Sequence, residues 1–110
     1  MALTFATTGV SILSTATTLY TATSNTKLSV ALCNTQAAAS ANITLYTVPN
    51  GSSAGTTNMA LNALAVASAA TVPTKDTLGD FRLGAGDKLV ALCATGQGGF
   101  VNAIISSIGL

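Results

Sequence analysis

The stretch LSVALC, residues 28–33, decides the fold of this 110-residue chain. Apolar side chains alternate with small ones along it, and a period of two is typical of a β-strand. Leu28, Val30 and Leu32 share one face, which is expected to lie in a core. The opposite face carries Ser29, Ala31 and Cys33, which are small and uncharged, so both faces of this strand are expected to be covered.

The rest of the chain indicates further short strands separated by turns. Pro49-Asn50-Gly51 is the strongest turn signal, and glycine-rich turns are expected at 84–87 and 96–99. Residues 59–70 are rich in alanine, but they lack polar residues at helical spacing, so a strand is preferred to a helix there. The prediction is an all-β protein, a β-sandwich or jelly roll of about seven to nine short antiparallel strands. Strands are expected at 28–33, 43–48, 59–70, 78–83, 88–94 and 100–108, and the first and second of these are expected to form a hairpin.

The composition supports strands and points to association. Apolar residues make up 49% of the chain and charged residues only 6%, far below the roughly 25% of ordinary soluble domains. The sequence contains no Glu, His or Trp, so it lacks the residues that usually solvate a long helix. A net charge of +1 gives little protection against self-association, which favours a subunit of a larger assembly. The alternative is a secreted protein that is simply coated with Thr and Ser.

The N-terminal region is expected to differ from the rest of the chain. Residues 1–17 are predicted to be an extended N-terminal arm or edge strands, and residues 18–110 a single β-sandwich domain. An uncharged strand of this kind can pair with its own sheet or with a neighbouring subunit. Four apolar residues are predicted to contact other subunits or a capsid: Leu3, Phe5, Val10 and Ile12.

The segment VALC occurs twice, at residues 30–33 and 90–93. A shift of 60 positions also matches Thr35 with Thr95 and Asn42 with Asn102. The preferred interpretation is that each half of a sandwich contains an equivalent strand-loop-strand hairpin. Two alternatives stay open: chance matches in an Ala- and Leu-rich chain, and a disulfide between the two cysteines.

Several classes of function are poorly supported. Without His or Glu there is no general acid or base beside Cys33 or Cys93, so an enzyme is not expected. Two separate cysteines do not make a zinc site, and no cofactor is predicted. No apolar run is long enough for a membrane span, and no basic patch suits nucleic acid. The aspartates are expected to form ordinary surface pairs with nearby cations and to bind no calcium; the groups concerned are Asp76, Asp80, Asp87, Lys75, Arg82 and Lys88.

Residues 18–110 resemble small virion proteins of tailed bacteriophages. The resemblance rests on TLYTATSNTKLSVALCNTQAAASANITLYTV, residues 18–48, and on LGAGDKLVALCATG, residues 83–96. It implies a β-sandwich, often trimeric, that is used as head decoration or as a fibre or tail module, and it implies no catalytic residues. One more expectation concerns location: synthesis in the host cytoplasm and a final position on the capsid exterior.

The function expected from these observations is that of a capsid cement or decoration subunit. It is expected to form a homotrimer and to bind the major capsid protein through apolar contacts. The alternative is a tail-fibre or baseplate module that binds a host-surface glycan, although the aromatic residues are scattered along the sequence. The predicted core consists of Leu28, Val30, Leu32, Leu45, Leu89, Leu92 and Ile105.

Overall fold

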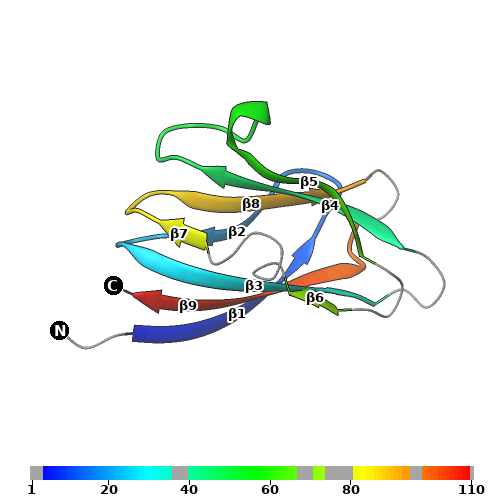
Figure 1. Cartoon of the computed structure of the whole chain (residues 1–110), viewed down its shortest axis with the longest axis horizontal. Coiled ribbons are helices and arrows are strands. Elements are labelled where there is room, and N and C mark those ends of the chain that lie inside the picture. The colour runs from blue at the N-terminus through cyan, green and yellow to red at the C-terminus, as the bar shows by residue number, and fades with distance from the viewer. Residues whose placement is uncertain (1–3, 36–39, 67–70, 74–80, 95–97, 110) are drawn as a thin grey trace.

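The computed structural model describes residues 4–35, 40–66, 71–73, 81–94 and 98–109 (Figure 1). Within these residues it contains nine β-strands and one 3-10 helix, so the predicted all-β fold is confirmed. The elements are β1 (Thr4–Ile12), β2 (Thr17–Thr21), β3 (Thr26–Asn34), β4 (Ala41–Val48), η1 (Thr56–Asn58), β5 (Met59–Val66), β6 (Thr71–Pro73), β7 (Phe81–Leu83), β8 (Lys88–Cys93) and β9 (Val101–Gly109).

The strands form two antiparallel sheets that pack as a sandwich (Figure 1). Sheet A has the order β1-β9-β3-β6, and β7 pairs with the start of β3. Sheet B has the order β2-β8-β4-β5. The strand preferred over a helix at 59–70 is present as β5, and residues 67–70 lie outside the described part.

The hairpin predicted from residues 28–33 and 43–48 is wrong. Both segments are strands, but β3 lies in sheet A and β4 lies in sheet B. β3 pairs with β9, and β4 pairs with β8. The chain therefore crosses from one sheet to the other between β3 and β4, and it crosses back between β8 and β9. Local alternation predicted the strands but gave no information about their partners.

The core lies between the two sheets and is formed by inward-facing side chains from both of them. Leu28, Leu32, Leu45 and Leu89 are fully buried there, as predicted. Val30 and Ile105 also lie in this core, which confirms those two predictions. Leu92 does not: it is half-buried, and it lies between two core residues of β8 on the outer face of sheet B.

The two VALC segments face opposite ways. In β3, Val30 and Leu32 point into the core and Cys33 points outward. In β8 the phase is reversed, because Cys93 lies in the core and Leu92 on the outer face. Identical residues therefore occupy opposite sides of their sheets.

One residue, Ser29, accounts for this reversal. The first segment is preceded by Lys27-Leu28-Ser29, and the second by Lys88 and a leucine only. In both strands the lysine lies on the outer face and the next leucine is buried, because a charge is costly inside a core. Since the side-chain period of a strand is two, one additional residue moves everything after it to the other face.

The pairing of the strands shows what is repeated in this fold. The inward residues of β3 and β8 correspond when Leu28 is matched with Leu89, and their partner strands β9 and β4 then correspond as well. Each ladder contains an apolar pair of one large and one small side chain, as close packing of a core requires. The inward pairs are Leu28–Ser107, Val30–Ile105 and Leu32–Ala103 in sheet A, and Leu89–Thr47, Ala91–Leu45 and Cys93–Ile43 in sheet B.

The disulfide alternative is excluded, because both cysteines are free thiols. Cys33 is half-buried on the outer face of sheet A. The Cys93 Sγ lies inside the sandwich, 3.6 Å from the Ile12 carbonyl oxygen to which it donates a weak hydrogen bond. Cys33 therefore points away from sheet B, whereas Cys93 points into the sandwich toward sheet A, so the two thiols lie on opposite sides of sheet A.

The turn before β8 is held by Asp87. Its carboxylate accepts hydrogen bonds from the backbone N–H of Gly84 and of Asn50, both at 2.9 Å. The turn also needs Gly86, which has a φ of 87° and leaves no room for a Cβ beside the Asn50 side chain. Asp87 thus ties two turns together at the point where the register of β8 begins.

Candidate functional site

The longest regular edge of the sandwich is β1. Within the described residues β1 pairs on one side only, with β9, through nine consecutive residue pairs and no register shift. The sequence of β1, TFATTGVSI, contains no charged residue and no proline. Charges, prolines and bulges are the usual devices that stop an edge strand from pairing with another chain. None of these devices is present in β1.

The other edges are shorter or irregular. The pairing of β2 shifts register between Thr18 and Tyr20, and the pairing of β5 shifts twice along β4. β5 also contains Ala63 with a φ of 52°, a left-handed conformation that is unusual for alanine. Bulges of this kind twist an edge away from a flat neighbour. The edge of the sandwich that is best suited to pair with a strand of another chain is therefore β1.

The four predicted interface residues fall in or just before β1, and the structure separates them. Leu3 lies outside the described residues, as does the side chain of Phe5. Val10 is half-buried against the core. Ile12 is fully buried and belongs to the chain's own core. Contact of these residues with a neighbouring subunit stays a prediction.

Two exposed apolar residues outside the predicted interface set lie at one end of the sandwich. Leu13 is 49% exposed and Phe100 is 43% exposed. They follow Ile12 and precede Val101, which are paired across β1 and β9. Each flanks a turn, where alternation gives no guide to the direction of a side chain. They add apolar surface at the end where β1 finishes.

Among the described residues, Asp87 forms no ion pair with Arg82 or Lys88, and its carboxylate accepts hydrogen bonds from two backbone N–H groups of the turns. Asp76, Asp80 and Lys75 lie outside the described residues. The described residues contain no group of three or more His, Cys, Asp or Glu side chains that would hold a metal ion. The helical content of the described part is the short η1, and no helix there is long and apolar enough to cross a membrane.

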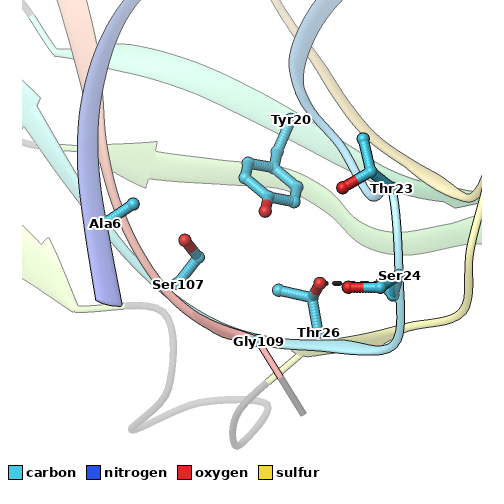
Figure 2. A pocket seen from close by; sticks show the side chains of 7 residues that line it. All are labelled: Ala6, Tyr20, Thr23, Ser24, Thr26, Ser107 and Gly109. Carbon is cyan, nitrogen blue, oxygen red and sulfur yellow. Dashed lines mark hydrogen bonds between the residues drawn. The ribbon is translucent and has the colours of Figure 1, made fainter. Parts of the chain in front are cut away.

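A pocket of about 220 Å³ opens between the sheets at the end opposite Leu13 and Phe100. Figure 2 shows that Tyr20 and Ser107 point into it from opposite sheets, and that the Thr23 hydroxyl faces the same space. The Thr26 hydroxyl, at its floor, donates a 2.8 Å hydrogen bond to the Ser24 carbonyl oxygen. The lining consists of Ala6, Tyr20, Thr23, Ser24, Thr26, Ser107 and Gly109.

Comparisons with known proteins identify a shared fold. Neither a scan against protein-family models nor a search of curated proteins finds a match to this sequence. A solved structure described as "Bacillus endospore appendages form a novel family of disulfide-linked pili" matches with a TM-score of 0.57 over 97% of this chain and 84% of that chain. The sequence identity is 14%, so the likeness concerns the all-β fold.

Proposed function

We propose that this protein is a structural subunit that assembles with other chains through the edge of sheet A. The observation that carries this proposal is β1, a nine-residue edge strand without a charge, a proline or a register shift. An exposed edge of this kind offers a row of backbone donors and acceptors to a strand of another chain.

The overall charge of the chain supports this role. With 6% charged residues and a net charge of +1, neighbouring copies repel each other little. Sheet extension needs backbone hydrogen bonds and small side chains more than charges. β1 meets this need, because Thr7, Gly9 and Ser11 alternate along its outer face. The half-exposed Ile104, which lies opposite Gly9 on β9, adds apolar area beside the edge.

The assembly itself is proposed to be the exterior of a phage capsid. The resemblance of residues 18–110 to tailed-phage virion proteins supports this finer statement. In that setting the subunit would be a decoration protein, a homotrimer that binds the major capsid protein and acts by burying surface, with no catalysis. The fold shared with a pilus chain supports a structural role in general and adds a second possible geometry. Head-to-tail contacts that close give a ring such as a trimer, and contacts that do not close give a fibre.

The test places charges on the edge. In the double variant Thr7→Lys, Ser11→Lys, two exposed side chains of β1 become cationic. The matched control is Ser52→Lys, Thr57→Lys, which adds the same charge at exposed positions in the turn after β4 and in η1. Light scattering after size exclusion measures the mass of each species, and electron microscopy distinguishes closed rings from fibres.

We expect the wild type and the control to form the same oligomer and the edge variant to be monomeric, with all three folded by circular dichroism. The wild type and the control should also bind to expanded capsids, and the edge variant should not. A wild type that stays monomeric and ignores expanded capsids would contradict the proposal. An edge variant that assembles as the control does would show that β1 is not the contact.

A further inference from the structure

We propose that the pocket between the sheets binds a neutral sugar ring, such as the terminal pyranose of a glycan. The pocket is formed by β1, β2, β3, β9 and the turn between β2 and β3. It lies beside the edge of β1 but does not depend on assembly, so this inference is independent of the proposed structural role.

A β-bulge places the aromatic ring in the pocket. In β2, Thr18 lies opposite Val90, and Tyr20 lies opposite Leu89, so Leu19 is the additional residue. As a result, two consecutive residues turn toward the interior: Leu19 is buried in the core, and Tyr20 packs beside it and lines the pocket. Without the bulge, Tyr20 would point to the outer face of sheet B. Bulges often re-aim a side chain at a binding site.

Ser107 supplies an unused polar group on the opposite wall. Its side chain is 6% exposed and lies in the pocket lining. Its hydroxyl makes no hydrogen bond with any group in the described part of the chain. A buried hydroxyl without a partner is costly, and a ligand hydroxyl or a water molecule is needed to satisfy it. The inward position that aligns with Ser107 in the other ladder, Thr47, lies outside this pocket.

The chemistry of the lining selects the class of ligand. None of its seven residues is charged, so neither an anion nor a cation is favoured. The hydroxyls of Thr23, Ser24 and Ser107 can exchange hydrogen bonds with a ligand that carries hydroxyls of its own. The Tyr20 ring offers an apolar face for the C–H side of a sugar. An apolar guest would leave the Ser107 hydroxyl unsatisfied, which disfavours a hydrophobic side chain from another subunit.

The size of the pocket limits the ligand to one ring. Its volume of about 220 Å³ is below the roughly 300–1,000 Å³ typical of sites for drug-sized molecules. A single pyranose is therefore the expected occupant, and a longer glycan would extend into solvent from the open side.

The test is a titration followed by amide NMR spectra of the full chain. The probes are methyl glucoside, methyl galactoside and N-acetylglucosamine, with N-acetylneuraminic acid as an anionic comparison. We expect at least one neutral sugar to shift the amides of Thr23 and Ser107 in a saturable manner, and the anionic sugar to bind more weakly.

Three variants assign the binding. Ser107→Ala and Tyr20→Ala should each raise the Kd by about tenfold, since each removes one specific contact. Tyr20→Phe keeps the ring and tests the hydroxyl, in case Tyr20→Ala disturbs packing. The matched control is Thr18→Ala, an exposed residue of the same strand, which should leave the Kd unchanged. Absence of saturable shifts, shifts confined to another surface, or binding unaffected by both Ser107→Ala and Tyr20→Ala would overturn the proposal.

Discussion

β3 and β8 contain the same four residues, Val-Ala-Leu-Cys, and use them in opposite ways. In β3 the valine and leucine fill the core, whereas in β8 the alanine and cysteine do so. The difference lies in what precedes each segment, because Ser29 has no counterpart between Leu89 and Val90. Four identical residues therefore do not determine which side chains of a strand face the core. The number of residues that separate them from the outward-facing lysine does.

The largest expected effect comes from changing which side chains of β3 face the core. Deletion of Ser29 gives β3 the same Lys-Leu-Val-Ala-Leu-Cys order as β8. With Lys27 still outside, Val30 and Leu32 would turn outward and leave alanine and cysteine in a core built for larger side chains. We expect a loss of more than about 5 kcal/mol, enough to prevent folding of a domain of this size.

Urea denaturation followed by circular dichroism measures this loss. Deletion of Ala54, an exposed residue in the loop before η1, is the control and should cost little. A Ser29 deletion variant with near-wild-type stability would mean that a bulge absorbs the shift, and that the lysine does not set the phase of β3.

The next effect compares the two leucines of the repeat. Leu32 is fully buried, so Leu32→Ala should cost about 2–5 kcal/mol through lost burial and a cavity. Leu92 is half-buried on the outer face, so Leu92→Ala should cost about 1 kcal/mol or less. The difference in urea midpoint between the two variants measures the effect. Equal losses would mean that both leucines are core residues, as the alternation in the sequence predicted.

The smallest effect concerns the reaction rates of the two thiols. Cys33 is half-buried on the outer face and should react with a maleimide in the folded protein. Cys93 is buried and should react only when the sandwich opens. Mass spectrometry of the variants Cys33→Ser and Cys93→Ser during labelling reports each rate separately. Faster labelling of Cys93 than of Cys33 would contradict the assignment of faces.

These comparisons show which parts of the fold were predictable. Alternation in LSVALC identified the strand, its buried face and the all-β class, because those properties depend on neighbours in sequence. The partner of β3 was not predictable in this way. The hairpin prediction failed because the connection 35–40 gives no sign of whether the chain returns to the same sheet or crosses to the other.

The candidate sites were predictable only in part. The uncharged residues 1–17 were predicted to form an arm or edge strands, and β1 is an edge strand of sheet A. Ile12 was selected for a contact surface because it is apolar, but alternation places it in the core. The pocket gave no signal, since Tyr20 and Ser107 are 87 positions apart and a bulge brings the tyrosine inward. Asp87 was predicted to form a surface ion pair, but its carboxylate accepts hydrogen bonds from backbone N–H groups. Every residue except proline has such a group, so the sequence does not show which ones Asp87 will bind.

The pairing of Thr4 with Gly109 has a practical consequence for orientation. Both ends of the described chain leave the sandwich together, at the end where Ala6 and Gly109 line the pocket (Figure 1). A fluorescent protein or an epitope fused to either terminus would project from that end and leave Leu13 and Phe100 uncovered. The position of a tag on either terminus, seen by electron microscopy, would therefore report which end of each subunit faces outward in an assembled particle.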